Sequence, residues 1–156
     1  MLKKIGIGLV AVIIIIQFFQ PTRENPPVVA DIQTNKEIKD ILKRSCYDCH
    51  SNEVRWPWYS YVMPVGWIIA DDVSEARREV NFSRWGEYET RRKLRKLNEV
   101  KEEIEEGKMP MASYEFMHGD SELSDADKSM IYQWVEQSIA ELKNPVVDSA
   151  KIEMSN

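Results

Sequence analysis

The two cysteines of this chain form one motif that constrains its fold and chemistry more than any other feature. They stand three positions apart and are followed directly by a histidine, in the stretch Cys46-Tyr47-Asp48-Cys49-His50. On one helical turn, positions i, i+3 and i+4 share a face, so both thiols can reach the vinyl groups along one edge of a haem while His50 turns beneath the iron. The C-x-x-C-H spacing therefore predicts one covalently attached haem c, with His50 as the proximal iron ligand.

Three other uses of the motif are weaker alternatives. A C-x-x-C redox pair normally stands beside a β-α-β pattern, and this sequence has no convincing strand. A zinc site would need His118 as its fourth ligand, because the chain has only two cysteines and two histidines. An inert disulfide between Cys46 and Cys49 is the third alternative. We favour haem over all three.

The N-terminus has the pattern of a targeting segment. Lys3 and Lys4 precede an apolar run from Ile5 to Phe19, and a basic start followed by a short apolar stretch is typical of a secretory signal or signal-anchor. The run is shorter than the roughly 20 residues of a comfortable membrane span. We interpret residues 1–20 as an uncleaved inner-membrane anchor that forms an apolar helix. The lysines then lie on the cytoplasmic side, and the rest of the chain faces the periplasm.

Beyond the anchor, the sequence divides into a tether, one domain and a tail. Residues 21–33 are polar and contain three prolines, which is typical of a linker. Apolar positions at helical spacing predict an all-α domain over residues 34–144, followed by a flexible tail over residues 145–156. Within the domain we expect helices over residues 36–44, 65–80, 83–106 and 124–144, with loops over residues 55–61 and 108–123.

Capping residues mark several of these boundaries. Asn35 is suited to cap the first helix of the domain, and Ser83 is suited to cap the third. Gly107 suits the position directly after that third helix. Ser124 and Asp127 resemble a capping box at the start of the last helix.

The second axial ligand has several candidates. Met109 precedes a proline and follows the predicted helix end at Gly107, and a loop is the right place for a ligand that must cross over a haem. Met111 and His118 are alternatives, and an open distal position is another. Met63 also precedes a proline but lies close to His50 in sequence. We favour Met109, because a thioether is a natural partner of a proximal histidine.

The C-terminal half of the domain resembles class I c-type cytochromes. The resemblance covers their distal-methionine loop and their last helix, and it implies a cytochrome c-like helical fold around one covalent haem. It also implies that the methionine before the proline binds iron, which points to Met109. The matching stretches are Gly107-Lys108-Met109-Pro110, Leu123-Ser124-Asp125 and Trp134-Val135.

A closer resemblance covers about residues 10 to 142. It is to the bacterial haem-binding domain family of small, N-terminally anchored, cytochrome-like proteins, and it implies a haem cofactor and a helical fold more than a particular role. Because a histidine at position 118 fits the family pattern, His118 stays open as a ligand. The matching stretches are residues 46–52, Trp56-Pro57-Trp58-Tyr59-Ser60, Pro64-Val65-Gly66-Trp67, Asn81-Phe82-Ser83-Arg84-Trp85, and Met109-Pro110 with Tyr114 and His118.

Aromatic and basic side chains are expected around the cofactor. Aromatic walls restrict water and so tune the potential of a haem, and arginine suits haem propionates because of its fork of donors. Arg55, Arg77 and Arg78 are candidates to pair with a propionate, and a solvent-exposed position is the default interpretation of each. The aromatic residues expected to pack around the haem are Trp56, Trp58, Tyr59, Trp67 and Trp85.

These features favour an electron carrier. The net charge of −5, from 21 basic and 26 acidic residues, argues against a nucleic-acid binder, because no basic excess is present to displace phosphate counterions. With both axial positions filled, the iron exchanges electrons and binds no substrate. We therefore expect redox proteins as partners at the membrane and no enzyme activity. The alternative is a haem enzyme or a sensor of gas or peroxide, with an open or displaceable distal ligand.

Overall fold

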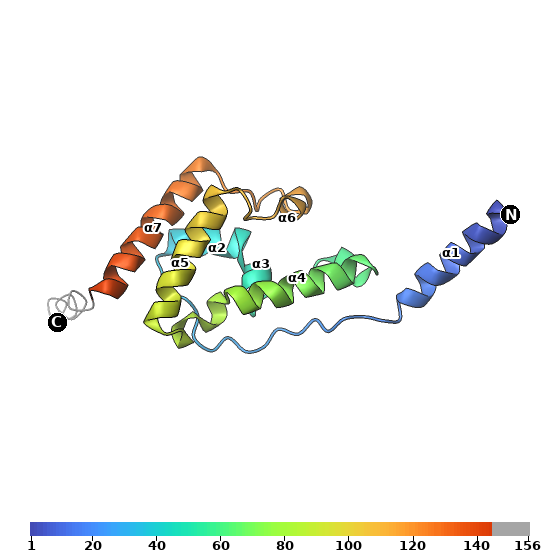
Figure 1. Ribbon diagram of the computed structural model, residues 1–156, viewed down its shortest axis with the longest axis horizontal. Coiled ribbons are helices and arrows are strands. Elements are labelled where there is room, and N and C mark those ends of the chain that lie inside the picture. The colour runs from blue at the N-terminus through green and yellow to red at the C-terminus, as the bar shows by residue number, and fades with distance from the viewer. Residues whose placement is uncertain (145–156) are drawn as a thin grey trace.

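The computed structural model describes residues 1–144, and every regular element in that range is helical. The expected all-α class is therefore confirmed for these residues, while the predicted tail over residues 145–156 lies outside them. The helix α1 stands apart from the others, which gather around one core (Figure 1). The elements are α1 (Leu2–Ile16), α2 (Lys36–Ser45), α3 (Tyr47–His50), α4 (Val65–Glu79), α5 (Thr90–Glu105), α6 (Ala112–Met117) and α7 (Asp125–Lys143), with the 3-10 helices η1 (Trp58–Tyr61) and η2 (Phe82–Glu87).

The core forms where α5, α7 and α2 meet (Figure 1). Apolar positions three and four apart give each of these helices one buried face: Leu97 and Ile104 on α5, and Ile131 and Val135 on α7. On α7 these two side chains are fully buried, Met130 is exposed at the edge of the apolar stripe, and the other apolar members of the stripe pack against the core as partly buried side chains: Trp134, Ile139 and Leu142. The remaining buried members of the core are Ile32, Ile38, Ile41, Leu42, Tyr47, Val80, Phe82, Trp85 and Leu123.

Two of the predicted N-terminal caps are present. The side chain of Asn35 accepts a hydrogen bond from the backbone N–H of Ile38 at 2.9 Å. Ser124 and Asp127 form the reciprocal bonds of a capping box at the start of α7. Short polar side chains encode these helix starts locally, so the sequence was sufficient to find them.

The predicted helix over residues 83–106 begins later than expected. Thr90 is its first residue, and residues 82–87 form η2 instead. Ser83 does not cap α5, because its buried hydroxyl accepts the backbone N–H of Asn52 at 3.0 Å. The chain uses this segment to bury Phe82 and Trp85 in the core. The expected loop over residues 108–123 also contains the short helix α6.

The segment over residues 21–33 is extended, as expected of a tether, but it is bound to the domain along part of its length. The backbone N–H groups of Ala30 and Ile32 donate to Ser83 and Phe82 at 3.1 and 2.9 Å, and that of Gly86 donates back to Ala30 at 2.8 Å. Ile32 enters the core. This segment therefore covers η2 and is part of the folded domain.

The apolar helix α1 has 15 residues, and almost all of its side chains are exposed. Over the described residues 1–144, none of the helices combines the length and the apolar character required to cross a membrane.

Candidate functional site

The C-x-x-C-H motif folds as one helical turn. The backbone N–H groups of Cys49 and His50 donate to the carbonyl oxygen of Cys46 at 3.2 and 2.9 Å. This turn places Cys46, Cys49 and His50 on the lining of one cavity of about 470 Å³. The two thiols are free rather than joined in a disulfide, so both sulfur atoms remain available for other chemistry.

His50 is held so that one ring nitrogen is free to bind a metal. Its Nδ1 lies 3.1 Å from the carbonyl oxygen of Ala76 and 3.1 Å from that of Val80. Both partners only accept hydrogen bonds, so Nδ1 carries the proton and Nε2 keeps its lone pair. Burial lowers the pKa of His50, against the opposing effect of the two carbonyls, and keeps the ring neutral. A carbonyl behind a histidine is the usual way in which a ligating imidazole is oriented.

Both cysteine thiols are protonated in this environment. Burial raises the pKa of Cys46 to about 12, with a further contribution from Cys49. Burial also raises the pKa of Cys49 to about 11, with Asp48 and Asp72 adding to the effect. The thiols are therefore neutral groups at the wall of a largely apolar cavity, and they are not poised as thiolate nucleophiles.

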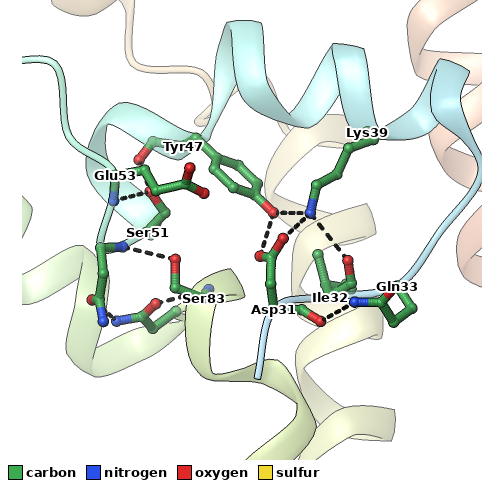
Figure 2. A network of polar contacts seen from close by, with 10 residues as sticks. Asp31, Ile32, Gln33, Lys39, Tyr47, Ser51, Glu53 and Ser83 are labelled. Carbon is green, nitrogen blue, oxygen red and sulfur yellow. Dashed lines mark hydrogen bonds and ion pairs between the residues drawn. The ribbon is translucent and has the colours of Figure 1, made fainter. Parts of the chain in front are cut away.

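The first intervening residue of the motif anchors the turn to the N-terminal segment (Figure 2). The hydroxyl of Tyr47 donates to the carboxylate of Asp31 at 2.7 Å, and the ammonium group of Lys39 donates to Tyr47 Oη at 2.6 Å. Lys39 is also paired with Asp31, and the Tyr47 ring stacks on Phe82 at 5.6 Å. Burial and the neighbouring Asp31 raise the pKa of Tyr47, so its hydroxyl remains a donor.

The second intervening residue, Asp48, anchors the turn to α6 and to the loop that follows the motif. The carboxylate of Asp48 accepts the hydroxyl of Tyr114 at 2.8 Å and the guanidinium Nε of Arg55 at 3.2 Å. Asp48 is buried, whereas most of Arg55 is exposed. The two residues between the cysteines thus hold the turn from two sides.

A tight helix end brings Met109 to the same cavity. After α5, Gly107 adopts φ of 68°, and the N–H groups of Gly107 and Lys108 donate to Ile104 and Glu103 at 3.1 and 2.9 Å. This is a Schellman motif, which reverses the chain at the predicted glycine. The N–H of Met109 also donates to Glu103, at 3.0 Å. Met109, Pro110 and Met111 all line the cavity.

The other ligand candidates lie elsewhere. His118 is not on the cavity lining: its Nε2 lies 3.3 Å from Tyr59 Oη, and its ring lies over that of Tyr114 at 4.3 Å. Met63 is 2% exposed and packs beside Gly66, where an added Cβ would lie 2.3 Å from its methyl group. Of the candidates, Met109 and Met111 are the ones that the fold places with His50.

The expected aromatic residues do not line the cavity. Trp58 is 76% exposed, and Trp85 belongs to the core beside Phe82. Trp56, Tyr59 and Trp67 are likewise absent from the lining, and η1, which contains Tyr59, packs against α4. The aromatic residues that do line the cavity are Phe82 and Tyr114. Both lie in stretches that the resemblance had matched, but spacing alone did not point to them.

The three arginines that are candidates to pair with haem propionates have protein partners. Arg77 donates to the carbonyl oxygens of Ser51 and Glu24 at 2.8 and 3.0 Å. Arg78 donates to Ser74 at 3.0 Å, and Arg55 is bonded to Asp48. None of the three lines the cavity.

One side of the cavity is acidic. The buried Lys96 donates to Glu79 at 2.8 Å and to Glu99 at 2.5 Å. These bonds raise its pKa even though burial acts in the opposite direction. Burial, Asp71 and Glu75 raise the pKa of Asp72. The carboxylates on the lining are Asp72, Glu75, Glu79, Glu99 and Glu103.

This donor set fits a haem better than a bare metal ion. The cavity offers an oriented imidazole, two thiols and two thioethers among apolar walls, and Ser45 on its lining has a buried hydroxyl without a partner in the described part of the chain. Among residues 1–144, no three histidine, cysteine or acidic side chains gather to hold a metal ion. The two thiols and His50 lack a fourth partner for zinc, since His118 lies elsewhere.

A helical domain with such a cavity belongs to the haem-binding class of proteins. The model of the haem-binding domain family matches residues 11–137, which is most of the chain, and the chain belongs to this family. Comparison with curated proteins and with solved structures gave no match. The cofactor is therefore haem.

Proposed function

We propose that this protein is a membrane-tethered, monohaem c-type cytochrome that carries electrons. The observation that supports this most directly is the placement of His50 and Met109 on one cavity, with His50 Nδ1 already bonded to two carbonyl oxygens. Haem supplies one-electron chemistry at its iron. We further propose that the helices adopt a cytochrome c-like arrangement.

Cys46 and Cys49 are the residues proposed to hold the haem covalently. Their positions on one turn direct both sulfur atoms toward the cavity, which suits two thioether bonds along one haem edge. We propose that a cytochrome-maturation system forms these bonds. Such systems act outside the cytoplasm, which agrees with the proposed location.

Met109 is the proposed distal ligand. Its backbone N–H donates to Glu103 in the last turn of α5, and its side chain, unlike that of Met111, packs against the buried core. A histidine–methionine pair raises the potential and leaves the iron no position for substrate. We therefore propose electron transfer and not enzyme activity.

The proposed location at the inner membrane rests on the N-terminal segment. Lys3 and Lys4 with the apolar residues after them suit retention at the inner membrane, with the domain in the periplasm. The redox partners would be proteins at that membrane. The acidic side of the cavity, which includes Glu75 and Glu103, suits a partner with a basic surface.

Optical spectra test this proposal. The full chain, expressed with a cytochrome-maturation system, should give a low-spin haem that resists organic extraction, has a sulfur-to-iron absorption feature and does not bind carbon monoxide. Met109→Ala should remove that feature and allow carbon monoxide to bind, whereas the matched control Met111→Ala should retain the native spectrum.

Three results would contradict parts of this proposal. Ready binding of carbon monoxide by the unaltered chain would favour the enzyme or sensor alternative. Extractable haem would contradict the covalent attachment. A spectrum unchanged by Met109→Ala but lost in Met111→Ala or His118→Ala would transfer the ligand assignment to that residue.

A further inference from the structure

One end of the domain presents an uncharged, aromatic surface. Residues 56–70 contain no Asp, Glu, Lys or Arg, and they form η1 and the first turns of α4. Large exposed apolar side chains that are concentrated in one short segment of a folded domain indicate an interaction surface. We call these exposed residues the aromatic end, and they are Trp58, Tyr61, Val62, Val65, Trp67 and Ile68.

The chain that leaves α1 is bonded directly to the aromatic end. Gln17 donates from Nε2 to the carbonyl oxygen of Met63 at 3.1 Å and accepts the N–H of Met63 at 3.0 Å. The indole N–H of Trp67 donates to the carbonyl oxygen of Phe19 at 2.7 Å. The end of α1 is therefore held beside η1 and the start of α4, as Figure 1 shows.

We propose that the aromatic end rests in the interface of the lipid bilayer that holds α1. The proposal builds on the membrane tethering proposed above, and it assigns a partner to the Trp-Pro-Trp-Tyr stretch, which the haem cavity does not use. Tryptophan and tyrosine favour the headgroup level of a bilayer, because their rings are apolar and their N–H and O–H groups stay hydrated. A lipid surface suits this patch better than a charged protein partner, because the patch has no charge to complement.

The length of α1 also agrees with a lipid surface. Its 15 residues rise roughly 22 Å at about 1.5 Å per residue, against a hydrocarbon thickness of about 30 Å. A helix this short draws the residues that flank it toward the bilayer.

This placement orients the haem cavity. Residues that line the cavity from α4 begin at Asp72 and continue to Glu79, whereas the aromatic end occupies the opposite end of the same helix. With the aromatic end on the bilayer, the acidic side of the cavity is left accessible to a water-soluble or membrane-bound redox partner.

The experiment places a fluorophore at defined positions of the full, haem-loaded chain in phosphatidylcholine vesicles. Trp58→Cys and Ile68→Cys carry a polarity-sensitive label on the aromatic end, and Ser129→Cys carries it on the exposed surface of α7 as the matched control. All three positions are exposed, so folding should be retained, and the haem spectrum checks this. The native cysteines do not react when both are bonded to haem.

The labels at positions 58 and 68 should emit at shorter wavelength than the label at position 129, and aqueous iodide should quench them severalfold less. Equal quenching at all three positions in chains that float with the vesicles would overturn the lipid contact and leave the tethering intact. Failure to float would overturn both. Efficient cross-linking between position 58 of two chains would show that a second copy covers the surface, which also overturns the proposal.

Discussion

The hydroxyl of Tyr114 donates a hydrogen bond of 2.8 Å to the carboxylate of Asp48, which lies between the two cysteines of the haem motif. This bond joins α6 to the turn that carries His50. Burial and Asp48 raise the pKa of Tyr114, so its hydroxyl remains a donor throughout the neutral range. Tyr114 lies shortly after Met109 in the sequence. The bond therefore fixes the segment that carries Met109 relative to His50.

Replacing Tyr114 by phenylalanine should loosen that segment. The buried Asp48 would lose a donor, at a cost of about 1–3 kcal/mol, and Met109 would be held less firmly over the cavity. We expect a weaker sulfur-to-iron absorption feature and a severalfold higher affinity for carbon monoxide, measured by optical titration. Tyr59→Phe is the control, because Tyr59 lies outside the cavity lining. Identical spectra and affinities for the two variants would argue against this positioning role.

The backbone conformation of Gly107 also positions Met109. Its φ of 68° is in the left-handed region, where a Cβ costs roughly 1–2 kcal/mol. Gly107→Ala should lower the free energy of unfolding by about that amount, as measured with denaturant, and should weaken the sulfur-to-iron feature. Gly119→Ala should change stability by less than about 0.5 kcal/mol, since no atom lies within 4 Å of its added Cβ and its φ is negative. Equal losses in the two variants would contradict the explanation from backbone conformation.

The features that could be predicted from the sequence are those encoded over a few residues. Asn35, Gly107 and Ser124 act within one helical turn, so their roles follow from local chemistry. The motif around His50 is local in the same sense. The apolar period of α7 also identified its buried face, although Met130 lies at the exposed margin of that stripe.

The features that could not be predicted depend on contacts between distant segments. The predicted start of α5 was wrong because the hydroxyl of Ser83 accepts a hydrogen bond from the backbone N–H of the distant Asn52 and does not cap the helix. No local pattern reveals this contact. The expected haem contacts of Trp58 and Trp85 were inferred from residue type, whereas the packing of η1 and η2 places these side chains elsewhere. Nor does spacing reveal that Tyr114 would reach Asp48.

Tyr47 provides a test of how the N-terminal segment supports the motif. Tyr47→Phe removes a hydroxyl that bonds both Asp31 and Lys39 (Figure 2), but it keeps the ring that stacks on Phe82. We expect a loss of about 1–3 kcal/mol in the free energy of unfolding of the haem-loaded chain. Tyr132→Phe should cost less, because the hydroxyl of Tyr132 makes no hydrogen bond within residues 1–144. A comparable loss in both variants would refute a specific role for the Tyr47 hydroxyl.

Asp72 should make the reduction potential depend on pH. It lies on the cavity lining near Cys49, and burial, with Asp71 and Glu75, raises its pKa above the ordinary 3.8. The charged carboxylate stabilises ferric over ferrous iron, so the potential should fall as pH rises through this pKa and level off above it. Asp72→Asn removes the charge and should raise the potential at neutral pH by tens of millivolts.

The two curves should converge at low pH, where the native carboxyl is protonated, and the Asp72→Asn curve should lack this fall. Potentiometric titration of the purified haem protein from acidic to neutral pH measures both. Asp71→Asn is the matched control, since Asp71 is exposed and absent from the cavity lining. Its potential at neutral pH should stay close to the native value, but its fall should move to lower pH, because Asp71 no longer raises the pKa of Asp72. A potential that rises with pH, or a larger shift from Asp71→Asn than from Asp72→Asn, would show that Asp72 is not the group that acts on the iron.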